Sequence, residues 1–250
     1  MATYGPGGRF AMTDRGRAAL RQTDQTLTIG PSSFHWDGKA LVIDLNEVSS
    51  LPLISRMKGR VTVTPSAITQ VELPLSPDGE HVWRPLAPIA RIKVSLDRPG
   101  WQFEGEGYLD SNFGTRPLER DFSFWTWARF GTKAGATCIY DAYRRDGSVL
   151  NAAIAFDPSG MARVVEGPPV TPLRKTLWSL RRETRADPGT MPRQVMPMLA
   201  PFYARALVET RIDGQVVRGV HEALDLDRFS KPVVKAMLAF RVPRRKGWLF

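Results

Sequence analysis

The chain has 250 residues, of which 42% are hydrophobic and 24% are charged, and its formal net charge is +10 with a pI near 10.2. This composition is typical of a folded globular protein and excludes an intrinsically disordered one. No run approaches the roughly 18 apolar residues that a membrane-spanning helix requires, and the single cysteine excludes an internal disulfide.

The first predicted element is a short helix over residues 13–22, TDRGRAALRQ, which opens on a cap-like threonine but contains Gly16. The sequence then becomes typical of β-structure. Runs rich in β-branched and aromatic residues predict strands at residues 26–29, 34–36, 40–45, 61–64, 89–96, 101–109, 122–130, 136–143, 149–156 and 162–166. Turn sequences such as WDG, PDG and RDG separate many of them. This spacing predicts a barrel or sandwich rather than alternating strands and helices.

The C-terminal part continues the β pattern. Residues 207–212 and 215–220 predict a hairpin across Asp213-Gly214. Residues 231–240, KPVVKAMLAF, have the apolar spacing of a terminal helix. Four prolines between positions 188 and 201 predict an irregular segment.

Chemistry is expected in the segment GEGYLDSNFG, which precedes the aromatic run FSFWTWARF. Tyr108 and Asp110 stand two residues apart, and such residues of a strand point to the same face. Glu104 and Glu106 share that face and are the substitutes for Asp110 if Asp110 is peripheral. Asp110, which precedes Ser111 and Asn112, is also typical of a turn.

A second pair with the same spacing, His81 and Trp83, lies in GEHVWRP. Together with TYGPGGRFAMTDRGRAALR, YLDSNFG, the W-x-W pattern and CIYDAYRRDGS, this pair resembles the carotenoid 1,2-hydratase family, also called hydroxyneurosporene synthases. The likeness covers most of the chain. Family members begin well before the segment that matches Thr3, so either an early strand is missing or the start is misassigned.

The resemblance implies a mainly β fold with few short helices, similar to tandem lipocalin-like proteins. In such proteins two lipocalin-like β-barrel or sandwich halves surround an apolar tunnel. On this analogy the chain divides near Pro117 into an N-terminal half, residues 1–117, and a C-terminal half, residues 118–250, that ends in a basic tail.

The resemblance also implies an activity, the addition of water to the terminal C1=C2 bond of acyclic carotenoids such as neurosporene or lycopene. A proton reaches C2, a tertiary cation forms at C1, and water captures it, so no metal and no organic cofactor is expected. The positions that match the catalytic set of the family are His81, Trp83, Tyr108 and Asp110. The alternative is a lipocalin-like carrier of a long apolar ligand, without catalysis.

Each matched residue has an expected role. Asp110 is the acid, because burial beside a hydrocarbon raises a carboxyl pKa from about 3.9. Trp83 offers its indole face to the cation. Tyr108 holds the water or the Asp110 carboxyl, and His81 takes a proton from the water. The roles of His81 and Asp110 could also be exchanged, and His81, taken alone, is more often a structural residue.

Three aromatic residues, Phe124, Trp125 and Trp127, are expected to bind the polyene. Their run contains Arg129 as its one cation, which favours a buried wall over a nucleic-acid surface, so no nucleic acid is expected as a partner.

The positive charge is concentrated in residues 174–185 and 240–250. The second stretch mixes cations with aromatic residues, as membrane-surface segments do, although a solvated terminus would look the same. The opening MATYGPGGRF lacks the apolar core of a secretory signal. We therefore expect a cytoplasmic protein that is peripherally associated with the inner or photosynthetic membrane.

Overall fold

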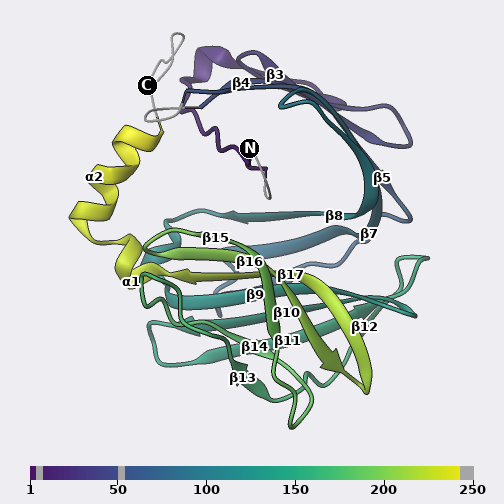
Figure 1. Ribbon diagram of the computed structural model, residues 1–250, viewed down its shortest axis with the longest axis vertical. Helices are drawn as coiled ribbons and strands as arrows, with labels where there is room; N and C mark the ends of the chain where they lie inside the picture. The colour runs from purple at the N-terminus through teal and green to yellow at the C-terminus, as the bar shows by residue number, and fades with distance from the viewer. Residues whose placement is uncertain (4–7, 50–53, 243–250) are drawn as a thin grey trace. The chain divides into compact units, whose positions relative to one another are not determined.

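The computed structural model describes residues 1–3, 8–49 and 54–242, and shows a mainly β protein built of antiparallel strands (Figure 1). Its few short helices are η1 (Arg17–Ala19), η2 (Leu118–Arg120), α1 (Leu226–Phe229) and α2 (Pro232–Arg241). Within these ranges no helix is both long and apolar enough to cross a bilayer. The predicted fold class and the predicted C-terminal helix are confirmed.

The chain forms two compact units, each assembled from separate stretches. The first unit contains residues 1–65, 90–108 and 235–250, and the second contains residues 66–89 and 109–234. The expected division near Pro117 is a single cut, whereas these units are interleaved along the chain. The assignment of residues 1–117 and 118–250 to two lipocalin-like halves therefore stays a prediction, as does the tunnel.

The first unit is an antiparallel meander. Its strands are β1 (Leu20–Gln22), β2 (Thr26–Ile29), β3 (Ser32–Trp36), β4 (Leu41–Val48) and β5 (Arg56–Pro65). Strand β5 pairs with the later part of β7 (His81–Arg98), which in turn pairs with β8 (Trp101–Gly114). Leu45, Val94 and Leu96 form the core of this unit, since alternate strand positions share a face.

The helix predicted over residues 13–22 is wrong. The segment forms one 3-10 turn after Gly16, and Leu20 to Gln22 continue as strand β1. Leu20 pairs with Ile29 of β2. Pairing with the neighbouring strand satisfies the hydrogen-bonding groups of the backbone here. It overrides a modest helical propensity that the glycine already weakens.

The second unit is built on a seven-stranded sheet. Its order is β12 (Ala162–Val164), β11 (Val149–Phe156), β10 (Gly135–Arg144), β9 (Phe122–Thr132), β17 (Gln215–Asp225), β16 (Tyr203–Ile212) and β15 (Arg193–Leu199). Figure 1 shows β9, β10 and β17 side by side. The unit also contains β6 (Leu73–Pro74), which pairs with the start of β7, and the small pair β13 (Val170–Pro172) and β14 (Glu183–Arg185).

Local turn chemistry explains two of its connections. The predicted hairpin between β16 and β17 is confirmed, and Asp213 and Gly214 both have positive φ, at 51° and 73°, as tight hairpin turns require. The segment predicted to be irregular contains strand β15 instead. Pro197 falls at a break in register between Val195 and Met198, and β15 is an edge strand, where proline is tolerated.

The seven-stranded sheet does not close into the expected barrel. Its strand order ends at β12 and at β15, and these two edges do not pair with each other in the described part of the chain. One face of the sheet is covered by an apolar core that includes Phe130, Ile139 and Val208. The opposite face carries Trp125 and Trp127 of β9 and Tyr140 of β10.

Candidate functional site

A hydrogen bond joins two of the predicted site residues. The indole Nε1 of Trp83, on β7, donates to Oδ2 of Asp110, on β8, over 2.9 Å. Trp83 is 1% exposed. Burial raises the pKa of the Asp110 carboxyl, and the Trp83 hydrogen bond and the Arg205 cation partly oppose that rise. A carboxyl in this setting holds its proton to a higher pH than one in water, which is what a general acid requires.

Aromatic rings surround Trp83. Its ring centroid lies 6.4 Å from that of Trp127 and 5.8 Å from that of Tyr140, and Trp125 lies 5.6 Å from Tyr140. We call Trp83, Trp125, Trp127 and Tyr140 the aromatic wall. Among the described residues, Nε1 of Trp125 is buried without a hydrogen-bond partner. Trp83, Trp127 and Tyr140 are buried, and the rings of the wall meet edge to face or at a tilt.

Phe124 does not belong to the aromatic wall. Side chains alternate along a strand, and Phe124 precedes Trp125 directly on β9. Its side chain therefore points to the opposite face from those of Trp125 and Trp127. There its ring packs 5.7 Å from Tyr143, and the Arg181 guanidinium lies 5.0 Å from its centroid. The structure therefore separates Phe124 from the two tryptophans with which it was predicted to bind substrate.

His81 has a carboxylate partner that the sequence analysis missed. Its Nε2 lies 2.7 Å from Oδ2 of Asp121, which also accepts a 2.6 Å hydrogen bond from Nε of Arg116. The pKa of Asp121 is lowered, mainly by Arg116 and further by His81. An ionised carboxylate can only accept, so Nε2 of His81 carries the proton. A Cβ at Gly114 would lie 2.4 Å from the other ring nitrogen, Nδ1, so a glycine leaves room for the ring.

The remaining predicted residues lie along β8. Tyr108 is half-buried two positions before Asp110, on the same face of the strand. Glu104 is exposed and pairs with Arg91 at 3.0 Å and Lys93 at 3.5 Å. The Arg91 hydrogen bond lowers the pKa of Glu104, so this residue is poorly suited to replace Asp110 as an acid.

A second carboxyl, Glu222, lies on the site face and was missed. Nη1 of Arg205 donates to its Oε1 over 2.7 Å. In the sheet, Arg205 is opposite Glu222, Glu222 is opposite Trp127, and Trp127 is opposite Tyr140. Burial raises the pKa of Glu222, and the Asp110 charge adds to the rise. In the sequence, Glu222 follows His221 in the strand-like segment GVHEAL, so the two side chains are expected on opposite faces. That pattern does not predict which strands pair with this one.

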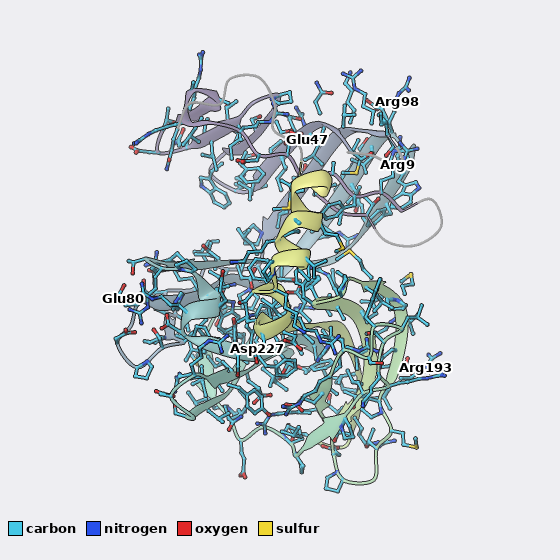
Figure 2. The ribbon with its side chains drawn as sticks, turned by 90° about the vertical axis from the view of Figure 1, so that its left-hand side faces the viewer. Arg9, Glu47, Glu80, Arg98, Arg193 and Asp227 are labelled. Carbon is cyan, nitrogen blue, oxygen red and sulfur yellow. The ribbon has the colours of Figure 1, made fainter. Side chains whose placement is uncertain are left out.

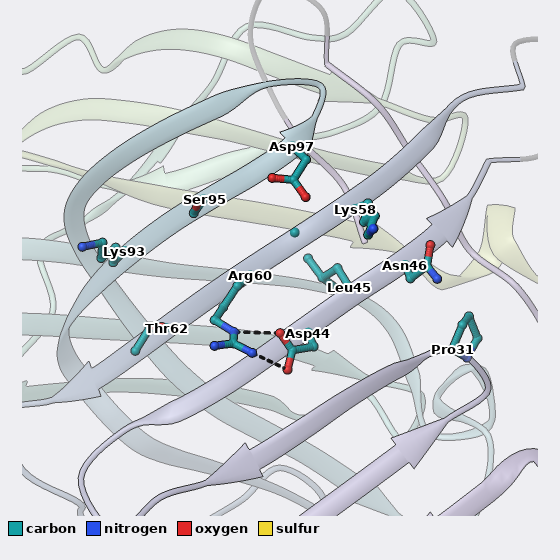
Figure 3. Close-up of a pocket in the computed structure, with 11 residues that line it drawn as sticks. Pro31, Asp44, Leu45, Asn46, Lys58, Arg60, Thr62, Lys93, Ser95 and Asp97 are labelled. Atoms are coloured by element: carbon teal, nitrogen blue, oxygen red, sulfur yellow. Dashed lines mark hydrogen bonds and ion pairs between the residues drawn. The ribbon is translucent and has the colours of Figure 1, made fainter.

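Two of the open cavities in the first unit differ in character. One, of about 590 Å³, is lined mainly by apolar groups that include Val61, Trp101 and Phe103. The other, of about 490 Å³, is lined mainly by polar and charged residues, which include the ion-paired Arg60 and Asp44 (Figure 3). The apolar cavity has a size and lining that suit part of a hydrocarbon ligand. In the described residues, no cluster of three or more histidine, cysteine or carboxylate side chains is arranged to hold a metal ion.

Comparison with known proteins places these observations in a family. A crystal structure of an AttH protein from Nitrosomonas europaea is similar to this one, with a TM-score of 0.57 and 16% sequence identity. The match covers 84% of this chain and 72% of that protein's chain. At this level of identity it shows a lipocalin-like fold alone. The acyclic carotenoid 1,2-hydratase of Cereibacter sphaeroides is 57% identical over all of this chain and 90% of that protein. The one from Rhodobacter capsulatus is 52% identical over 99% and 89%. The profile of the family described as carotenoid hydratase CrtC matches residues 1–250, and the chain therefore belongs to that family.

Proposed function

We propose that this protein adds water to the terminal C1=C2 bond of acyclic carotenoids such as neurosporene or lycopene, within carotenoid biosynthesis. The observation that carries the proposal is the Asp110 carboxyl, whose pKa is raised by burial and which is hydrogen-bonded to Trp83 beside the aromatic wall. Neutral Asp110 gives its proton to C2, and the electron pair of the double bond forms the new C–H bond. The cation left at C1 is captured by water, which then loses a proton.

The aromatic residues act on the cation and on the polyene. A desolvated cation over an indole face is stabilised by about 2 kcal/mol, which is more than tenfold in rate when the charge develops in the transition state. Trp83 is the residue that both offers such a face and contacts the acid. Trp125 and Trp127 hold the hydrocarbon chain, and Tyr108 holds the water or the acid.

The Asp121 contact supports the role of His81 as the base. Because Nε2 of His81 carries the proton that bonds Asp121, Nδ1 keeps a lone pair with which to accept a proton from water. A carboxylate that orients an imidazole in this way also stabilises the imidazolium that forms. The exchanged assignment, in which protonated His81 is the acid, uses the same contact.

We further propose that the protein is cytoplasmic and takes its substrate from the surface of the inner or photosynthetic membrane. The support is the loop at residues 174–178, whose Leu177 and Trp178 are 95% and 54% exposed beside exposed Arg174 and Lys175. The hydroxyl of Thr176 accepts from two backbone amides of this loop, of Trp178 and Leu180, both at 3.1 Å. Apolar side chains beside cations suit a lipid headgroup region. The predicted basic tail lies almost entirely in residues 243–250, outside the described residues.

The decisive experiment is incubation of the purified protein with liposomes that contain lycopene, in water enriched in ¹⁸O. We expect products heavier by one or two labelled waters, with the label at C1. In deuterated water, deuterium should appear at C2. Tight binding of lycopene without any change in its mass would identify a carrier instead.

A further inference from the structure

The ion pair between Arg205 and Glu222 lies on the site face of the sheet, beside the residues that contact Asp110. Its two side chains are 28% and 16% exposed. Glu222 is directly opposite Trp127 on the neighbouring strand β9, and Trp127 contacts the Trp83 ring that bonds Asp110. Trp127 and Trp83 thus connect the pair to the acid.

The charges that face Asp110 come from several strands. Arg205, on β16, lowers the pKa of Asp110, and the Asp110 charge raises the pKa of Glu222, on β17. Tyr140 and Cys138, on β10, also face it but are uncharged, because burial raises the pKa of the Tyr140 phenol and raises that of the Cys138 thiol to about 12. Arg129, on β9, acts on Cys138 and donates to the Pro88 carbonyl over 2.8 Å.

A cation near a carboxyl favours the ionised carboxylate, which cannot deliver a proton. Arg205 alone would therefore work against an acid at Asp110. Glu222, held 2.7 Å from the guanidinium, compensates that charge. In a poorly hydrated site, charges act on one another over longer distances than in water, and so does the compensation of the Arg205 charge by Glu222.

We propose that Glu222 is a positioning residue of the hydration reaction, which compensates the Arg205 charge so that Asp110 keeps the proton that it must deliver. This inference rests on the proposed function. It assigns the pair an electrostatic role rather than a merely structural one. The two roles differ in what they predict for the pH dependence of the reaction.

The test compares pH profiles of lycopene hydration in single and double variants. In Glu222→Gln the charge of Arg205 is no longer compensated and lowers the pKa of Asp110. The alkaline limb of the pH–rate profile, where the rate falls because Asp110 loses its proton, therefore moves to lower pH by about one unit. The rate at pH 7.5 falls about tenfold as a result. In Arg205→Gln the cation that favours the Asp110 carboxylate is absent, so the alkaline limb of the pH–rate profile moves to higher pH or stays in place. The double variant returns toward the wild-type profile, and Glu222→Asp, which keeps the charge, stays close to it.

A matched ion pair in the same sheet is the control. Arg193 on β15 and Glu209 on β16 also pair across strands, at 3.2 Å, but are 68% and 36% exposed, and Figure 2 shows Arg193 pointing away from the ribbon. We expect Glu209→Gln to leave the profile unchanged. Thermal unfolding of every variant confirms that it is folded. A folded Glu222→Gln with an unshifted or alkaline-shifted limb would overturn the inference.

A second measurement does not depend on turnover. The ¹³C resonance of the Asp110 carboxyl, assigned by its loss in Asp110→Asn, reports the ionisation of this group directly. We expect its titration midpoint to move to lower pH in Glu222→Gln. If the wild type does not hydrate lycopene but the midpoint moves, the proposed function fails and the electrostatic role of Glu222 stands. If the wild type hydrates and neither the limb nor the midpoint moves, the role of Glu222 fails alone.

Discussion

The indole of Trp83 and the carboxyl of Asp110, 27 residues apart in the chain, meet at 2.9 Å. The bond orients the carboxyl. It also stabilises the carboxylate, and so limits the rise in pKa that burial causes. The balance between these two effects sets the pH range over which Asp110 can act as an acid.

Replacing Asp110 by asparagine removes the transferable proton while keeping the size of the side chain and an acceptor for Trp83. We expect turnover of lycopene to fall by about a hundredfold to ten-thousandfold, the usual contribution of a general acid. Binding, followed by quenching of tryptophan fluorescence, should be nearly unchanged. Glu104→Gln, at an exposed carboxyl of the same strand, is the control. Retained turnover in Asp110→Asn would remove this residue from the acid role.

Two substitutions of Trp83 separate its hydrogen bond from its ring. Trp83→Phe keeps an aromatic face but loses the donor, so the pKa of Asp110 should rise further and the alkaline limb of the pH–rate profile should move to higher pH. Trp83→Leu loses both and should cost about a further tenfold in rate. Initial rates across pH distinguish the two effects. Equal rates in the two variants, with the alkaline limb of both where the wild type has it, would assign the whole contribution of Trp83 to packing.

The exposed Leu177 and Trp178 provide a test of membrane association. We expect the double change to serine to reduce binding to anionic vesicles by about tenfold or more, since two apolar side chains leave the interface. Stability should change little because Leu177 is 95% exposed and Trp178 is 54% exposed. Co-sedimentation with vesicles measures the binding. Met161→Ser, at another exposed apolar residue, is the control, and equal loss of binding in that variant would contradict a specific role for the loop.

His221 should make stability depend on pH. It is 1% exposed, and burial lowers its pKa to about 4, below the value of about 6.5 in an unfolded chain. Between these values the unfolded state binds more protons, so stability is complete above pH 6.5 and is lost as the pH falls toward 4. We expect this residue to account for about 2 kcal/mol of the loss between pH 7.5 and pH 5.

Urea unfolding at the two pH values checks this expectation. His221→Gln keeps a donor for the backbone oxygen of Glu183, which lies 2.7 Å from Nε2. Between pH 7.5 and pH 5 its loss of stability should be smaller than that of the wild type by about 2 kcal/mol. His35→Gln, at an exposed histidine, is the control. Equal losses in the wild type and in His221→Gln would show that the buried ring does not carry the effect.

Much of the fold followed from local patterns in the sequence. Runs rich in β-branched and aromatic residues predicted most strands, the Asp213-Gly214 turn predicted its hairpin, and apolar spacing predicted α2. The spacing of Tyr108 and Asp110 placed both on one face of a strand. The same alternation put Phe124 on the opposite face from Trp125, a consequence that the sequence analysis overlooked. These features depend on neighbouring residues, whose geometry the backbone dictates.

Tertiary structure alone decided which residues meet across the sheet. Strand β9 pairs with β17 about 90 positions later, and that register places Glu222 opposite Trp127. The pairing of His81 with Asp121 likewise joins distant segments, and the open edges at β12 and β15 replaced the expected barrel. Local patterns specify which face a side chain takes but not its partner strand, because strand order and register depend on how the whole chain buries its apolar surface.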